Sequence, residues 1–187
     1  MDTGVKMRAK PMPDVKFCLV FRRETLSVPV MRRVLGDTLR GLGMDEESVY
    51  DILLAATEAC TNVLTHGGRK VRGYEVLTSL GAVGCQVEVA DEGVGLAPGN
   101  PALSNAALSK SALSNSALSK SAERGAPDPQ QTPIAQLPES GRGLAVMRAC
   151  VDNVTLDSRP GRGTVVTMRK RIRWPDDAPL RQLRAAS

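Results

Sequence analysis

Apolar residues between positions 45 and 66 recur at steps of three and four, which is the period of one face of an α-helix. Asp45 precedes this stripe and can accept hydrogen bonds from the first free backbone N–H groups. Glu46 and Glu47 place negative charge where the helix dipole favours it. The pattern therefore predicts a helix over 45–66 that stops at Gly67. Its apolar stripe consists of Val49, Ile52, Leu53, Ala56, Cys60, Val63 and Leu64.

The rest of the chain mixes strand and helix patterns, which is typical of an α+β domain. Strands are predicted at 15–22, twice within 73–91 around a turn near 81–84, and twice within 153–173 around the turn 159–163. Helices are predicted from Ser27, as a capping residue, to Gly41, and over 143–151. We expect one domain over 15–173, a flexible arm at 1–14 and a flexible tail at 174–187.

Residues 97–140 break this pattern. The segment 102–122 repeats every five residues, with leucines at positions 103, 108, 113 and 118. Five residues turn a helix through about 500°, so the leucines would spiral around it and form no single stripe. The repeat also resembles pentapeptide-repeat solenoids, but four short repeats are too few to stack stably. We expect a mobile, partly helical low-complexity insert that ends in an extended proline-rich segment.

Composition places the chain among globular proteins. Of its 187 residues, 42% are hydrophobic and 24% charged, while aromatics make up only 3%, so aliphatic residues must build the core. It contains no apolar run of membrane-spanning or signal-peptide length, and we expect a cytoplasmic protein without a membrane anchor. The four cysteines, Cys18, Cys60, Cys85 and Cys150, are widely spaced and read as buried reduced thiols.

The net charge of +5 permits an acidic partner but does not require nucleic acid. Cations cluster at Arg22–Arg23, at Arg32–Arg33 and within 168–173. These clusters lack the interleaved aromatic residues on which single-stranded nucleic acid stacks. Solvated surface is therefore the favoured interpretation, and we expect no direct binding of nucleic acid.

A row of polar residues marks a second edge of the helix at 45–66. Glu58, Asn62 and His66 stand four residues apart and therefore stack along that edge. A solvated face would explain the row if nothing else accompanied it. Two later segments, however, carry chemistry of a related kind.

The first of these segments ends an alternating apolar run in Asp91, Gly93 and Gly95. A carboxylate at Asp91 can accept a hydrogen bond from an exocyclic amine, and the glycines let a flat ring approach the backbone. A plain turn at the end of a strand is the alternative interpretation.

The second segment, Gly141-Arg142-Gly143-Leu144, opens a predicted helix. Backbone N–H groups at a helix start favour anions such as phosphates, although a plain loop is the alternative. Gly163-Thr164 follows at the start of the last strand, where Thr164 can reach a phosphate or simply favour the strand.

The order E-x-x-x-N-x-x-x-H, D-x-G-x-G, G-x-G-L and G-T resembles the Bergerat ATP-binding fold of the GHKL superfamily, and most of all its anti-sigma-factor serine kinases. The resemblance covers 15–173 apart from the insert. It implies a two-layer α/β sandwich, with a mixed, mostly antiparallel sheet and helices on one face. It also implies that 97–140 forms a lengthened ATP lid.

The resemblance further implies roles for the motif residues toward ATP and Mg²⁺. Glu58 would accept a proton as the catalytic base, Asn62 would be the Mg²⁺ ligand, and His66 is interpreted as a structural part of the motif. An amide oxygen suits Mg²⁺, a hard ion that takes its other ligands from water and phosphates. The residues expected to bind the nucleotide are Asn62, Asp91, Gly93, Val94, Gly95, Gly141, Arg142, Gly143, Leu144 and Thr164.

The function implied is an anti-sigma factor that is also an ATP-dependent protein serine kinase. It would sequester a sigma factor, phosphorylate a serine on an anti-sigma-factor antagonist, and form a homodimer. A non-catalytic ATP-binding regulatory module is the alternative from another class. A sensor histidine kinase fits less well, because the chain's one histidine, His66, lies inside the nucleotide motif.

Overall fold

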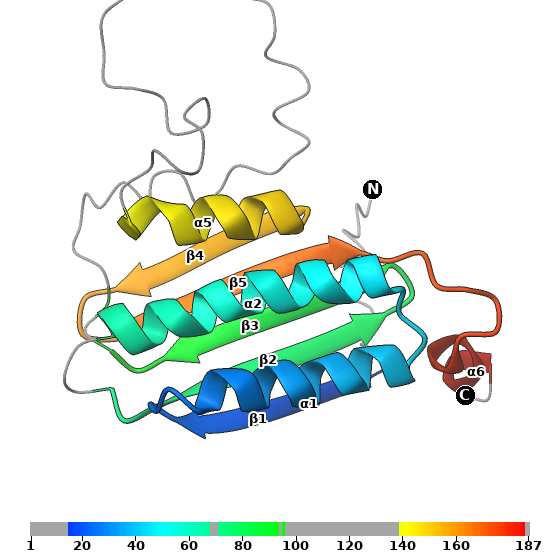
Figure 1. Ribbon diagram of the computed structural model, residues 1–187, viewed down its shortest axis with the longest axis horizontal. Helices are drawn as coiled ribbons and strands as arrows, with labels where there is room; N and C mark the ends of the chain where they lie inside the picture. The colour runs from blue at the N-terminus through cyan, green and yellow to red at the C-terminus, as the bar shows by residue number, and fades with distance from the viewer. Residues whose placement is uncertain (1–14, 68–70, 94, 96–138, 186–187) are drawn as a thin grey trace, which may run out of the picture.

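The computed structural model of the protein describes residues 15–67, 71–93, 95 and 139–185. A five-stranded sheet in the order β1-β2-β3-β5-β4 carries three helices on one face (Figure 1). The predicted two-layer α+β sandwich is therefore confirmed. The elements are β1 Val15–Arg22, α1 Ser27–Gly41, α2 Glu46–His66, β2 Gly73–Gly81, β3 Gly84–Asp91, α5 Glu139–Cys150, β4 Asn153–Arg159, β5 Gly163–Arg171 and α6 Pro179–Ala185.

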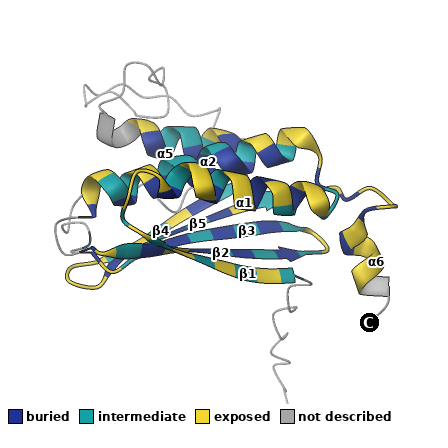
Figure 2. Ribbon diagram, turned by 60° about the horizontal axis from the view of Figure 1, so that its bottom comes forward, coloured by how far each residue is buried: buried dark blue, intermediate teal, exposed yellow. Residues whose placement is uncertain are grey.

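Every strand pair among the described strands is antiparallel, so the sheet is not mixed. Period-two alternation turns one set of side chains toward the helices, and these residues are buried in the middle of the sheet and half-buried in β1 (Figure 2). Val89 of β3, for example, lies opposite both Val76 of β2 and Val166 of β5, and the three form one apolar row under the helices. This register places equivalent positions of neighbouring strands at the same end of the sheet.

Helix α2 forms as its sequence predicts. Asp45 Oδ1 accepts a hydrogen bond from the Ser48 N–H at 2.8 Å, which confirms the cap. Six of the seven predicted stripe residues are buried, and Leu64 packs partly buried against the same core. Helix α2 contacts β3 and β5, α1 contacts β1, and α5 contacts β4 and α2. The central helix therefore packs between the other two, over the middle of the sheet.

Ser27 does not cap helix α1, which corrects the prediction. The helix begins at Ser27 itself, and no side-chain cap precedes it. The Ser27 hydroxyl instead donates to the Glu24 carbonyl at 2.5 Å and accepts from the Tyr74 hydroxyl at 2.7 Å. These bonds tie the start of α1 to β2 in the buried interior, where a polar group must find a partner.

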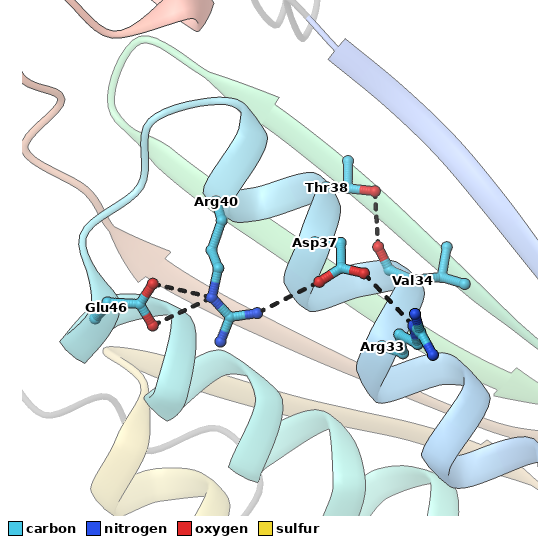
Figure 3. Close-up of polar contacts among 6 residues, drawn as sticks. All are labelled: Arg33, Val34, Asp37, Thr38, Arg40 and Glu46. Atoms are coloured by element: carbon cyan, nitrogen blue, oxygen red, sulfur yellow. Dashed lines mark hydrogen bonds and ion pairs between the residues drawn. The ribbon is translucent and has the colours of Figure 1, made fainter.

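Charged side chains join the end of α1 to the start of α2 (Figure 3). Arg40 Nε donates to the two carboxylate oxygens of Glu46 at 2.9 and 3.2 Å, and Arg40 also lies 3.7 Å from Asp37. Because these groups face water, such pairs contribute little to stability. The pair between Lys170 Nζ and Asp51 Oδ2, 2.8 Å apart, is mostly buried and links β5 to α2.

The segment after β5 packs against the domain, so the prediction of a flexible tail is wrong for residues 174–185. Trp174 Nε1 donates to the Gly81 carbonyl at 3.0 Å, and Leu180 is fully buried. Gly43, at φ +87°, lies so close to Ala178 that a β-carbon there would meet it at 2.9 Å. The segment thus holds the α1–α2 connection and the β2–β3 turn together. The segment is short and has few apolar residues, so it shows no hydrophobic period from which this packing could be predicted.

Several other expectations have definite outcomes. Cys60, Cys85 and Cys150 are buried as predicted, but Cys18 is exposed because it lies on the uncovered face of β1. None of the described helices combines the length and apolar character that a membrane crossing requires. The arm at 1–14 and the repeat at 102–122 lie outside the described residues.

The packed C-terminal segment can be tested with two leucines of the same helix. Leu180 is fully buried, whereas Leu183 is 53% exposed. Leu180→Ala should lower the free energy of unfolding by about 3 kcal/mol, because it removes buried methyl groups and leaves a cavity. Leu183→Ala should change it by less than about 0.5 kcal/mol. Urea denaturation measures both, and equal values for the two variants would show that α6 does not dock.

Candidate functional site

Four chain segments meet at one end of the sheet. Helix α2 and strand β3 end there, and helix α5 and strand β5 begin there (Figure 1, left). All the motif residues predicted from the sequence that the structure describes lie on these segments or directly after β3. The fold therefore gathers motifs that are separated by up to about a hundred residues in the chain.

Gly143 of α5 lies against the polar row of α2. A β-carbon at Gly143 would lie 3.2 Å from Glu58 Oε2, 3.3 Å from Asn62 Nδ2 and 3.4 Å from Asn62 Oδ1. Both polar side chains are half-buried. The absence of a side chain at Gly143 thus leaves a carboxylate and an amide side by side, next to the first turns of α5.

Helix α5 begins earlier than predicted. It starts at Glu139, so Gly141, Arg142 and Gly143 lie within its first turns and not in a turn before it. The free N–H groups of a helix start belong to its first turn, which here lies before Gly143. Arg142 is exposed and Leu144 packs against the core. A phosphate at this helix start would therefore meet N–H groups closer to Gly141 than to Gly143.

Asp91 ends β3 on the face that the helices cover. Its Oδ1 accepts a hydrogen bond from the Gly93 N–H at 2.7 Å, and Thr164 lies directly opposite in β5. Burial raises the pKa of the Asp91 carboxyl above its ordinary 3.8, against the lowering effects of the Gly93 and Thr164 backbones and of the Arg23 charge. The carboxylate is thus partly desolvated and suited to accept a hydrogen bond from a ligand.

Two glycines are required beside Asp91. A β-carbon at Gly93 would overlap Asp91 Oδ1, and one at Gly163 would overlap the Asp91 carbonyl. Gly163 also adopts φ +80°, a conformation that other residues rarely take. Gly93 lies close to the carbonyl of Gly67, which caps α2. The backbone leaving β3 therefore touches the end of the helix that carries Asn62.

Ser158 joins the site without having been predicted. Its hydroxyl lies 2.8 Å from Thr164 Oγ1 and donates to the Gly163 carbonyl at 3.2 Å. Tyr74, Asp91, Thr164 and Ser158 thus form one row across four strands. The predicted turn 159–163 already places Ser158 opposite Thr164. Ser158 could therefore have been found from the sequence by deriving the strand register from that turn.

Three motif residues named from the sequence remain, namely Gly95, His66 and Val94. Gly95, at φ +69°, lies against the carbonyl of Arg159, where a β-carbon would overlap it. His66 is exposed in the last turn of α2. Val94 lies outside the described residues. The roles assigned to these residues toward a nucleotide stay predictions.

The oxygen atoms of Asn62 and Glu58 fit a hard divalent cation such as Mg²⁺, which binds few protein ligands when phosphates supply the others. Gly143 leaves space beside both side chains. Across the described part of the chain, no group of three histidine, cysteine or acidic residues forms a metal site of its own.

Comparisons with known proteins find a family match, related sequences and a similar fold. The family described as the histidine kinase-like ATPase domain matches residues 21–170. An anti-sigma F factor from Clostridium acetobutylicum is 28% identical over 134 residues, covering 70% of this chain and 76% of the relative. An anti-sigma F factor from Thermoanaerobacter sp. is 27% identical over 127 residues, covering 67% and 72%. The crystal structure of the RsbU and RsbW domains of a Mycobacterium tuberculosis protein has a similar fold (TM-score 0.55, 17% identity), covering 86% of this chain but 33% of that one.

Replacing Asp91 should have opposite effects on the stability of the protein and on its binding of Mg-ATP. Because burial raises the folded-state pKa, the ionised carboxylate costs stability above that pKa, and the cost disappears as the pH falls below the ordinary 3.8. Asp91→Asn should therefore raise the thermal unfolding midpoint at pH 7 without ligand, and this gain should shrink toward acid pH. Mg-ATP at a hundredfold excess over its Kd stabilises a protein that binds it by about 2.7 kcal/mol. The Asp91→Asn variant should lose this stabilisation.

Asp157→Asn is the matched control, since it removes the same charge from an exposed position on β4. It should leave the response to Mg-ATP as in the unsubstituted protein. A lower midpoint for Asp91→Asn than for this control at pH 7 would contradict the assigned burial cost.

Proposed function

Because the chain belongs to the histidine kinase-like ATPase domain family, we propose that it is an ATP-binding anti-sigma factor and protein serine kinase. Membership in that family confirms the resemblance to GHKL proteins. In the proposed function, the protein holds a sigma factor inactive and transfers the γ-phosphoryl group of Mg-ATP to a serine on an antagonist protein. The observation that carries this proposal is the close approach of Gly143 to both Glu58 and Asn62, where a β-carbon would lie 3.2 to 3.4 Å from their side chains.

Nucleotide binding is supported by the complementary groups at the end of the sheet. Asp91 offers a partly desolvated acceptor to the adenine amino group, beside glycines that let neighbouring backbone pass close to this residue. The start of α5 offers N–H groups and a positive helix end to the phosphates. Asn62 would hold Mg²⁺, which when bound neutralises charge on the phosphate oxygens.

Phosphoryl transfer is supported by the position of Glu58. Its carboxylate stands one helical turn before Asn62 and beside the same glycine of α5. A carboxylate so placed can accept the proton of an attacking serine hydroxyl while the phosphates are held in line. The chain thus supplies a base and a metal ligand from one helix, at a fixed separation.

The proposed partners follow from the relatives. Two relatives are named anti-sigma F factors, and the solved structure with a similar fold contains a domain named RsbW. A sigma factor and an anti-sigma-factor antagonist are therefore the proposed partners of this chain. We propose further that the chain forms a homodimer and acts in the cytoplasm. The net charge of +5 suits acidic partner surfaces.

Substitution of the proposed base tests the kinase. Glu58→Gln should bind Mg-ATP within about threefold of the unsubstituted protein, because the amide keeps the shape of the side chain. Its transfer of labelled phosphate from ATP to the antagonist serine should be slower by about 10²- to 10⁴-fold, the usual contribution of a general base. Calorimetry measures the binding, and phosphoserine analysis of the co-purified antagonist measures the transfer.

Glu47→Gln is the control, because Glu47 is exposed at the far end of the same helix. It should transfer phosphate at the unsubstituted rate. If the unsubstituted protein binds Mg-ATP but labels no serine, the non-catalytic ATP-binding module replaces the kinase as the function.

A further inference from the structure

Arg22 and Arg23 are adjacent in sequence but have different environments. Arg22 is the last residue of β1 and is exposed on the uncovered side of the sheet. Arg23 directly follows the strand and is half-buried. The interpretation of this pair as solvated surface charge therefore holds for Arg22 alone.

Arg23 binds the end of α2. Its Nη2 donates to the Leu64 carbonyl at 2.5 Å, and its backbone N–H donates to the Arg72 carbonyl at 3.0 Å. Leu64 lies in the last turn of α2, where carbonyl groups lack partners within the helix and carry the negative end of its dipole. A guanidinium at this position supplies both a donor and a complementary charge, so it holds the last turn in place.

The same guanidinium acts on Asp91. Its positive charge favours the ionised carboxylate, in opposition to the burial of that group. Asp91 pairs with Tyr74, near the start of the strand that follows Arg72. Arg23 therefore interacts with the end of α2, the approach to β2 and the end of β3.

We propose that Arg23 is a positioning residue for the nucleotide site. Its guanidinium fixes the last turn of α2, which follows Asn62, relative to the carboxylate of Asp91 at the end of β3. This inference rests on the proposed nucleotide binding and adds to it a residue outside all four motifs. Arg23 touches no reacting atom, and it acts through Asn62 and Asp91.

The adjacent arginine provides a matched control for the test. Arg23→Gln removes the charge but keeps a polar side chain, and Arg22→Gln makes the same change on the exposed side. Calorimetric titration should show the Kd for Mg-ATP raised about tenfold or more by Arg23→Gln, as expected for loss of a charged hydrogen bond. Arg22→Gln should change it less than twofold.

A lysine variant distinguishes positioning by charge from packing alone. Arg23→Lys keeps a positive donor and should bind Mg-ATP within about threefold of the unsubstituted protein. A tenfold loss in the lysine variant, or equal Kd values for Arg23→Gln and Arg22→Gln, would overturn the inference. If Arg23→Gln does not fold, the lysine variant decides by the same criterion.

The titration of the unsubstituted protein separates the two proposals. No heat with Mg-ATP would overturn the proposed function, and this inference with it. Binding by the unsubstituted protein, with no difference between the two glutamine variants, would overturn the role of Arg23 alone.

Discussion

Burial of the apolar stripe of α2 against the sheet is the interaction on which the site depends. Val49, Ala56 and Cys60 are fully buried, so the helix cannot rotate about its axis without exposing them. The period of 3.6 residues then directs the row of Glu58 and Asn62 along a different edge, toward α5. The core therefore determines the direction of the polar side chains, and the fold is inseparable from the site geometry.

Close backbone approach is the second requirement. Gly143 leaves space beside the polar row of α2, and Gly93 and Gly163 let two backbones meet around Asp91. A carboxylate kept partly out of water in this way is unfavourable for the folded protein, as is common where a group must be ready for a ligand. Stability must then come from elsewhere in the molecule.

The opposite end of the sheet supplies some of that stability. Trp174 and Leu180 pack the C-terminal segment against the α1–α2 connection and the β2–β3 turn, and α6 lies on the far side from the site (Figure 1). The apolar packing and the polar site thus occupy opposite ends of the strands. Arg23 belongs to the polar end, where it compensates both the Leu64 carbonyl in the last turn of α2 and the charge of Asp91.

Local sequence determined the features whose causes lie within a few residues. The Asp45 cap, the stripe of α2, the alternation of the strands and the order of the four motifs could all be predicted, because each depends on short-range geometry. Tertiary structure decided the rest. Ser27 bonds Tyr74 instead of capping a helix, Leu180 finds a buried place in a short segment, and Arg23 reaches Leu64. These outcomes depend on partners 40 or more residues away in the chain. The hydrophobic period of a segment does not indicate which distant surface its side chains will contact.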